Sequence, residues 1–495
     1  MQFSEISKYK INKENTDSFD IVLKLKEYVS EVINIKKFSS LNEKFSEITG
    51  VPFNVIKKKN KQILMSSFNY KNGKFNENLK IYKIFFSAFQ FLSIIVISFF
   101  LRKKFLTKVS ANIILIDVDS IRDYERYSLL LDKFDNSVVF FNYNNEIQTD
   151  KINKNKVRFF NLKNTNYLNH NFFEKKYLKL IIFLFQLFFT SIYLKFNFIH
   201  FYSILLFSSC KNYWIFQNYK SKYLIQDRFY RTCPIRNFFF KKYGGVVSCC
   251  TQKNIIESCI SCFIDIDIFF SLGDEKESKN KLIKLGGRVG ETYPVGSMFM
   301  EHDWYRKKND NLKVLSSDVL ILGLNPNTWM EVNNINNKNY NKIYLEWIKN
   351  LSLDFPDLKI LIKHHNNLSN NDNEISFFKG TKVKSVIKTE SKNYSYGFLE
   401  KSKIAFSFGS TMILEGIGDG KKCFFIDPKL KSTCFFEGLK NLDILRISNY
   451  VDFKKIIVKY LFNKNRFDLD NIDKFCLKSD KVSEKIFNYL LSKQL

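Results

Sequence analysis

Asn112-Ile-Ile-Leu-Ile-Asp117 is a short apolar run that ends in an acid, and Ser137-Val-Val-Phe-Phe-Asn142 is a second such run. An apolar run without charges is typical of a parallel strand that is buried on both faces. Between the two runs, Tyr124–Phe134 has the spacing of an amphipathic helix. Strand, helix and strand in about thirty residues is the order of a βαβ unit. The stretch therefore predicts an α/β fold with a parallel sheet.

The same pattern extends along the chain in two series. In the first series we expect further strands at 196–201, 213–216, 222–226, 244–249 and 268–273. A polar, charged segment, Glu301–Asn311, separates them from a second series with strands at 318–323, 358–363, 404–408, 422–427 and 443–447. The interpretation is of two Rossmann-like domains, 106–305 and 306–495, that face each other across a cleft. Residues 1–105 are predicted to form a mostly helical extension.

Two apolar stretches indicate contact with a membrane or with a core. Residues 84–101 carry no charge and precede Arg102, Lys103 and Lys104. Their length just reaches the lower limit for a membrane-spanning helix, and a basic flank suits anionic headgroups. A membrane-associated helix and a core helix both fit residues 84–101. The shorter stretch Leu180–Leu194 is predicted to be a buried or interfacial helix.

The charge balance points to an anionic partner. Lysine and arginine total 78 against 49 acidic residues, a net charge of +29. The abundance of lysine, asparagine, isoleucine and phenylalanine also fits an A/T-rich coding bias, which explains part of this excess. Basic residues are scattered and no RNA-recognition motif is present, so nucleic acid is not an expected partner. An anionic membrane surface or a nucleotide diphosphate fits the remaining charge better.

The cysteines and the amino terminus bear on location. The nine cysteines include one CxxC pair, Cys259 and Cys262, without the second pair that a zinc site needs. Free buried thiols in a reducing compartment are the expectation. Met1–Lys26 is polar and does not resemble a secretory signal. We expect a cytoplasmic protein at the inner face of the cell membrane.

The first candidate site is Phe408-Gly409-Ser410-Thr411, with Glu415 one turn later. A glycine and two hydroxyls at a helix start can hold a diphosphate, because the helix N-terminus offers free N–H groups and partial positive charge. Glu415 is then placed to accept hydrogen bonds from ribose hydroxyls. Ordinary helix capping explains the same hydroxyls.

Three other groups follow predicted strands. Lys363-His364-His365 offers a cation and imidazoles for phosphate binding or proton transfer, although a solvated loop fits equally. Asp227, beside Arg228 and Arg231, is a candidate general base, or else half of a surface ion pair. Gly296 and Ser297 are expected to line the cleft or to form a simple turn.

The order of these groups resembles the carboxyl-terminal half of GT-B-type transferases of bacterial surface polymers. A Lys-x-His at a strand end is followed, about forty residues on, by Gly-Ser-Thr at a helix start and then by Lys422-Cys-Phe-Phe-Ile-Asp427. The group includes CDP-glycerol glycerophosphotransferases and capsular polysialyltransferases. There, a Lys-x-His-Pro motif and a Ser-Ser or Ser-Thr turn face the phosphates of the donor nucleotide.

Lys363 and His365 match the lysine and histidine of that motif, and Ser410 and Thr411 match the hydroxyl pair. Asn366 stands where the group has proline. Tyr293-Pro-Val-Gly-Ser297 looks like the turn that closes the first domain in the group. The resemblance covers about residues 220–440.

The resemblance implies a glycosyltransferase that needs no metal or cofactor. It would move a sugar or related group from a nucleotide-activated donor to a polysaccharide or lipid-linked acceptor. Lys363, His365, Ser410 and Thr411 would stabilise the leaving diphosphate, and Asp227 would act as base. Asp265-Ile-Asp267 has the spacing of a metal motif but lies on an apolar strand. A non-hydrolysing nucleotide-sugar 2-epimerase and a non-enzymatic basic binding protein are the alternatives.

Overall fold

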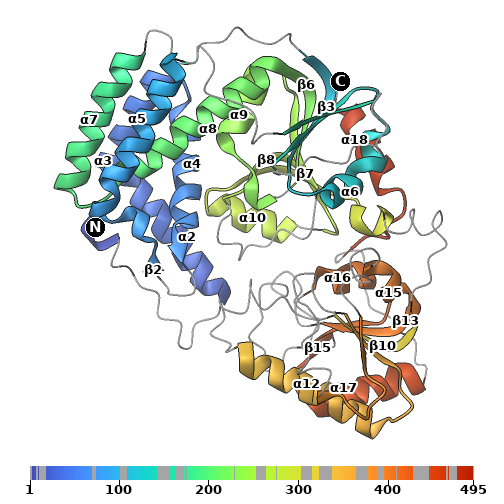
Figure 1. Ribbon diagram of the computed structural model, residues 1–495. Coiled ribbons are helices and arrows are strands. Elements are labelled where there is room, and N and C mark those ends of the chain that lie inside the picture. The colour runs from blue at the N-terminus through green and yellow to red at the C-terminus, as the bar shows by residue number, and fades with distance from the viewer. Residues whose placement is uncertain are drawn as a thin grey trace.

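The computed structural model of the 495-residue chain describes part of its length. Described are residues 3–6, 9, 18–69, 74–100, 109–142, 156–161, 172, 176–227, 229–251, 263–274, 276–302, 315–322, 337–363, 377–386, 395–407, 410–426, 445–463, 467 and 476–493. Within these ranges the chain forms two parallel sheets and a group of N-terminal helices, seen in blue in Figure 1. This confirms the prediction of two Rossmann-like domains with a mostly helical N-terminal extension.

The first sheet has seven parallel strands in the order β5-β4-β3-β6-β7-β8-β9. Their bounds are β3 Val109–Val118, β4 Ser137–Phe141, β5 Val157–Asn161, β6 Tyr219–Gln226, β7 Val247–Thr251, β8 Asp265–Ser271 and β9 Arg288–Pro294. The helices of this domain are α6 Ile121–Leu131, α8 Phe198–Asn218, α9 Pro234–Lys242 and α10 Lys276–Lys284. The inner strands, such as β4 and β7, are buried on both faces, and they therefore have near-continuous apolar sequences.

The second sheet has six parallel strands in the order β12-β11-β10-β13-β14-β15. Their bounds are β10 Ser317–Leu322, β11 Ile360–Lys363, β12 Lys384–Ser385, β13 Ser402–Ser407, β14 Cys423–Ile426 and β15 Arg446–Ile447. Its helices are α12 Asn337–Asp354, α15 Ser395–Lys401, α16 Thr411–Gly418 and α17 Tyr450–Ile457. This domain has a core of its own, separate from the cores of the first domain.

Both sheets reverse their winding in the same way. In each sheet the first strand in the chain lies between the second and the fourth, so neighbours β3 and β6, and neighbours β10 and β13, feed connections to opposite faces. Such a pair marks a topological switch point, and ligands of open α/β sheets bind in the crevice beyond its carboxyl ends. The fold thus assigns one such crevice to each domain.

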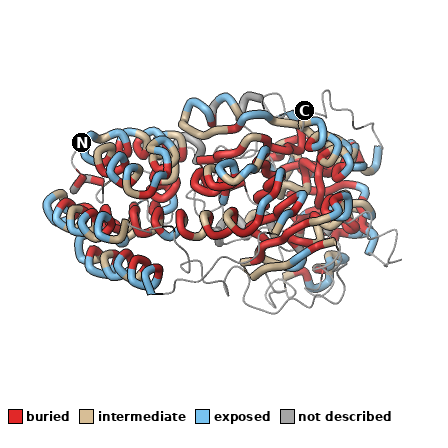
Figure 2. Tube along the Cα trace, turned by 90° about the horizontal axis from the view of Figure 1, so that it is seen from above, coloured by how far each residue is buried: buried red, intermediate tan, exposed pale blue. Residues whose placement is uncertain are grey.

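The N-terminal extension packs on the first domain (Figure 1). It consists of α1 Phe3–Ile6, α2 Ser18–Asn34, α3 Lys36–Thr49, α4 Phe53–Ser66, the strand pair β1 Phe68–Asn69 and β2 Lys74–Phe75, and α5 Ile84–Phe100. A later helix, α7 Tyr177–Tyr193, joins this group. Gln62 of α4 donates to the carbonyls of Thr232 and Phe263, both at 2.7 Å. These buried bonds attach the extension to the first sheet. In Figure 2 the exposed positions lie mainly on the outer helices.

Two strands expected in the first series are wrong. Residues 196–201 and 213–216 belong mostly to the long helix α8, which Asn197 caps by accepting from the His200 N–H at 3.2 Å. Fourteen of the 21 residues of α8 are buried. A helix that is covered nearly all round has no polar face, so its apolar runs cannot be distinguished from buried strands by periodicity.

The chain ends on the first domain rather than on the second. Helix α18, Val482–Ser492, buries Val482, Ile486 and Leu490 in the core beneath α6. The Tyr223 hydroxyl of β6 donates to the Leu490 carbonyl at 2.9 Å. The sequence pattern placed residues 306–495 in the second domain, because a long-range packing partner cannot be read from local spacing.

Candidate functional site

The carboxyl-terminal edge of the second sheet brings together two of the candidate groups. The strand register places Leu322 of β10 beside Lys363 of β11 on one side and beside Ser407 of β13 on the other. Since neighbouring strands are about 4.8 Å apart, the backbones of Lys363 and Ser407 lie about 10 Å apart. Lys363 is buried. A buried lysine therefore ends β11 next to the switch point between β10 and β13.

Ser410 starts helix α16 at this edge. Its side chain accepts from the Met412 N–H at 3.3 Å, and its own N–H donates to Ser407 Oγ at 3.1 Å. Ser407 Oγ in turn donates to the Leu322 carbonyl at 3.1 Å. The capping interpretation of Ser410 is therefore confirmed. The same N-terminal turn presents N–H groups and partial positive charge, which suit an anion. Thr411, the first helical residue, is half-buried.

Glu415 lies deeper along α16 and is fully buried. Its two carboxylate oxygens accept from Ser297 Oγ at 2.8 Å and from the Tyr396 hydroxyl at 2.6 Å. Ser297 belongs to the turn after β9, so this contact joins the two domains. Ser297 Oγ also accepts from the Met300 N–H at 3.2 Å. A role of Glu415 toward ribose stays a prediction, and its observed role is to hold α16 against the first domain.

Gly296 is required at this junction by its backbone. Its φ is +94°, a region that side chains disfavour, and a Cβ there would meet the carbonyls of Leu477 and Lys478 at 3.0 and 3.2 Å. Residues 476–479 form a strap that passes from the second domain toward α18. The Ser297 N–H donates to Ser479 Oγ at 3.0 Å, and the Leu477 N–H donates to the Leu272 carbonyl at 2.8 Å. Gly296 thus permits a close approach of two backbones.

A small pocket opens where the domains meet. It contains about 260 Å³ of space, part of it open to solvent. Its lining comes from the ends of β7 and β8, the turn after β9, and α16: Thr251, Phe270, Leu272, Val295, Gly296, Ser297, Met298, Phe299 and Glu415. The space narrows to room for about one water molecule, so the pocket itself does not hold a nucleotide sugar.

Asp227 follows β6 at the switch point of the first sheet and is fully buried. Its side chain is hydrogen bonded to Tyr127, whose hydroxyl lies 2.5 Å from Thr251 Oγ1. Burial raises the pKa of the Tyr127 hydroxyl well above its usual value, and the nearby Asp227 carboxylate raises it further. Because Thr251 lines the pocket, Asp227 is connected to it through two hydroxyls. The predicted role of Asp227 as base stays a prediction.

A buried ion pair that the sequence did not predict lies beside Asp227. Arg236 of α9 donates through Nη1 and Nη2 to the two carboxylate oxygens of Asp117, at 2.5 and 3.0 Å, and to Gln226 Oε1 at 2.8 Å. Both charged residues are buried. Burial lowers the pKa of Arg236, but the attraction of Asp117 outweighs it and raises that pKa. Asp117 also has φ +70°. The only signal in the sequence was an acid at a strand end.

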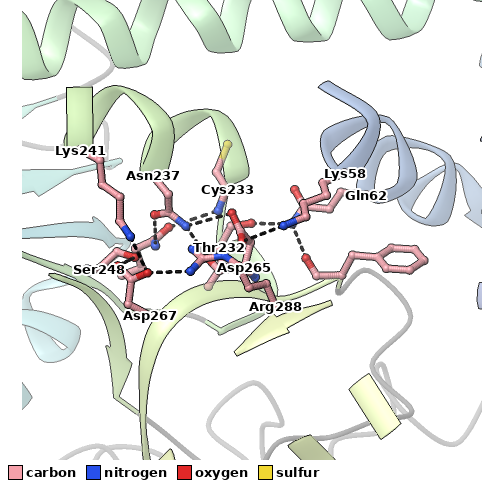
Figure 3. A network of polar contacts seen from close by, with 12 residues as sticks. Lys58, Gln62, Thr232, Cys233, Asn237, Lys241, Ser248, Asp265, Asp267 and Arg288 are labelled. Carbon is pink, nitrogen blue, oxygen red and sulfur yellow. Dashed lines mark hydrogen bonds and ion pairs between the residues drawn. The ribbon is translucent and has the colours of Figure 1, made fainter. Parts of the chain in front are cut away.

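The Asp265-Ile-Asp267 pair is occupied by cations from the protein itself (Figure 3). Arg288 donates to Asp265 at 2.5 Å through Nε and to Asp267 at 2.6 Å through Nη1. Lys241 reaches Asp267 at 2.7 Å, and Lys58 of α4 lies 3.7 Å from Asp265. The network ties α4 and α9 to β8 and β9, which is a structural role.

Three predicted site residues, His364, His365 and Gly409, lie outside the described residues. In the part of the chain that is described, no group of three or more His, Cys, Asp or Glu side chains has metal-ligand spacing. Six cysteines within the described ranges are buried thiols that form no disulfide: Cys210, Cys233, Cys249, Cys250, Cys423 and Cys476.

No protein-family model matches the sequence, and no curated protein matches it either. Solved structures resemble its fold at low identity. The UDP-GlcNAc 2-epimerase from Methanocaldococcus jannaschii is 13% identical with a TM-score of 0.46, covering 78% of this chain and 100% of its own. The UDP-GlcNAc-bound epimerase from Neisseria meningitidis is 11% identical (TM-score 0.44, 77% and 100%). The wall teichoic acid polymerase TagF is also 11% identical (TM-score 0.43, 83% and 97%). Function is therefore argued from the residues of this chain.

Proposed function

We propose that this protein is a glycosyltransferase that takes a sugar, or a related group, from a nucleotide-activated donor. The acceptor would be a polysaccharide or a lipid-linked glycan. The donor would lie at the carboxyl-terminal edge of the second sheet, and the acceptor at the corresponding edge of the first.

The observation that carries the proposal is the common edge of β11, β10 and β13. Its register puts Lys363 and the start of α16 on opposite sides of β10, next to the switch point. A pyrophosphate needs positive charge and N–H donors, and this edge supplies both: one ammonium group, the helix N-terminus and the Ser410 hydroxyl. These groups would stabilise the charge that develops on the leaving nucleotide diphosphate.

The first domain supplies the matching half of the proposed reaction. Asp227 also follows the strand at a switch point, and its link to Tyr127 and Thr251 leads to the pocket between the domains. A proton from an acceptor hydroxyl would pass to Asp227 through the hydroxyls of Thr251 and Tyr127. The contact between Ser297 and Glu415 fixes the two edges relative to each other.

Donor binding is tested first, by thermal shift with a panel of nucleoside diphosphates and nucleotide sugars. A ligand that binds the folded state raises the melting temperature. For the best ligand, titration calorimetry compares wild type with Lys363→Met and Ser410→Ala. We expect affinity to fall about 10- to 100-fold for Lys363→Met, since a hydrogen bond to a charged group contributes about 1.5–3 kcal/mol. Lys382→Met, at an exposed lysine of the same domain, is the matched control and should bind normally.

The reaction is tested by the release of free nucleotide from the identified donor. Release that requires an added glycan or glycolipid acceptor supports a transferase. Conversion of the donor to a C2 epimer without acceptor would instead identify an epimerase. Unchanged binding in both Lys363→Met and Ser410→Ala would contradict the proposed donor site.

A further inference from the structure

Helices α5 and α7 expose an apolar face that the rest of the protein does not cover. The large apolar side chains on it are each more than a third exposed: Phe85, Phe86, Phe89, Leu92, Val96, Ile97, Phe99 and Phe100 on α5, and Leu178, Ile182, Phe185, Phe189, Ile192 and Tyr193 on α7. On each helix most of them recur three or four residues apart, so they form one stripe. We call these fourteen residues the α5–α7 face.

The two stripes lie on neighbouring antiparallel helices. Phe85 near the start of α5 contacts Phe188 near the end of α7, with ring centroids 5.4 Å apart. Phe99 near the end of α5 contacts Tyr177 at the start of α7, at 5.3 Å. The helices stand together at the edge of the molecule in Figure 1. Monomeric proteins seldom expose a contiguous apolar patch above a few hundred Å². The face holds seven phenylalanines that each present roughly 150–250 Å² when fully exposed, so it exceeds that area.

The chemistry around the face identifies its partner. Neither α5 nor α7 contains an acidic residue. Lysines lie at both ends of the helix pair: Lys80 and Lys83 before α5, Lys176 and Lys179 at the start of α7, and Lys195 just after its end. An apolar band with a basic rim matches a bilayer whose headgroups are anionic. A second copy of this chain would bring two basic rims together, against a net charge of +29 on each copy.

Polar bonds hold α5 on the protein rather than across the bilayer. By length and composition, Ile81–Phe100 could span a membrane. However, the opposite side of α5 is buried, and Asn197 donates to Ser87 Oγ at 2.9 Å while Ser203 donates to the Ser87 carbonyl at 3.2 Å. The Tyr177 hydroxyl donates to the Ser98 carbonyl at 3.1 Å. A spanning helix would lose these bonds, and the buried Asn197 and Ser203 would no longer have these partners.

We infer that the α5–α7 face docks onto an anionic membrane, with both helices lying in the plane of the interface. The apolar stripes enter the boundary between headgroups and acyl chains, and the lysines contact the headgroups. The inference does not depend on the proposed function, because it rests on residues of the N-terminal extension and α7 alone.

The test is flotation of the full chain with vesicles of phosphatidylcholine, with and without phosphatidylglycerol. We expect wild type to float with the anionic vesicles, and Phe89→Ser combined with Phe185→Ser to lose at least tenfold in binding. Leu353→Ser combined with Val451→Ser replaces apolar residues of similar exposure on the second domain and should float like wild type. All of these side chains are exposed, so melting temperatures should match that of wild type and exclude unfolding as the cause.

The rim and the orientation have tests of their own. Lys179→Gln combined with Lys195→Gln should weaken binding to anionic vesicles by about fivefold per lysine and leave binding to neutral vesicles unchanged. A tryptophan introduced by Phe89→Trp should be quenched most by lipids brominated near the headgroup. The inference would be overturned if the Phe89→Ser, Phe185→Ser variant floated as well as wild type, or if quenching were strongest from lipids brominated at the bilayer centre. It would also be overturned if wild type did not bind vesicles and dimerised through this face.

Discussion

At the scale of single residues, burial decides what each charged group can do. Lys363 and Glu415 are both buried, the first at the end of β11 and the second within α16. Glu415 is committed to Ser297 and Tyr396. Lys363 ends β11 at the edge to which β13 also leads, and under the proposed function its charge would meet a donor phosphate. Asp227 reaches the pocket through hydroxyls rather than directly.

The first residue-scale prediction concerns Ser297→Ala. The change removes a donor from the buried carboxylate of Glu415 and should lower the free energy of unfolding by about 1–3 kcal/mol. Urea unfolding measures this, with Ser492→Ala, an exposed serine of α18, as control. If Ser297→Ala and Ser492→Ala unfold at the same urea concentration as wild type, the contact does not join the domains in solution.

The second residue-scale prediction concerns how the stability contributed by Asp267 depends on pH. Burial alone would raise the pKa of Asp267, but hydrogen bonds from Lys241 and Arg288 outweigh it and hold that pKa below its usual 3.8. The ionised carboxylate therefore adds stability above about pH 4, and this stability is lost as the pH falls through the lower folded pKa.

Asp267→Asn should accordingly cost about 1–3 kcal/mol near neutral pH, and the difference from wild type should shrink as the pH falls below 4. Urea midpoints across this pH range measure it. Asp357→Asn serves as control, because Asp357 is fully exposed and pairs with Lys382 at the surface. A difference that stays constant with pH would mean that the Figure 3 network is not ionised as described.

At the scale of elements, the strands were predictable and the long buried helix was not. Apolar runs such as 112–117 and 404–408 correspond to strands β3 and β13, because a strand that is buried on both faces has apolar residues at successive positions. In α8 the same apolar density arises from a helix buried on most sides. Of the candidate site, the strand-end positions of Lys363, Asp227 and Ser410 were predictable. Arg236 was not, because its pairing with Asp117 joins residues more than a hundred positions apart.

The turn after β9 supplies the element-scale prediction. Gly296→Ala would place a Cβ against the carbonyls of Leu477 and Lys478 and also strain a positive φ. Gly50, which ends α3, has a similar φ of +72° but no atom within 4 Å of its Cβ position. Gly50→Ala should thus lower the free energy of unfolding by the backbone cost alone, about 1 kcal/mol. Gly296→Ala should lower it by clearly more. Equal losses in thermal or urea unfolding would contradict the close packing of the strap.

At the scale of the whole molecule, the two domains are held together by the strap and by α18. The chain leaves the second domain at residues 476–479, contacts Leu272 and Ser297, and ends as a helix on the first domain. Glu301 secures this helix by accepting from Ser483 Oγ at 2.6 Å and from its N–H at 2.9 Å. The relative placement of the carboxyl-terminal edges of the two sheets therefore depends on residues 476–492.

A chain that ends at Lys478 tests this dependence. It lacks the buried Val482, Ile486 and Leu490, each worth about 2–5 kcal/mol when truncated to alanine. The total is comparable with the stability of a domain, so the first domain should unfold or become protease-sensitive while the second resists. A chain that ends at Lys493 keeps the packing and should behave as wild type. A fully resistant first domain in the shorter chain would show that α18 is dispensable.

The most direct test of the central claim is amide hydrogen exchange with and without a saturating nucleoside diphosphate. The account predicts that bound nucleotide slows exchange in two peptides, one that contains Thr411–Ile413 at the start of α16 and one that contains Lys363 at the end of β11. Exchange in α8 should not change. Protection confined to other segments, or none despite bound nucleotide, would contradict it.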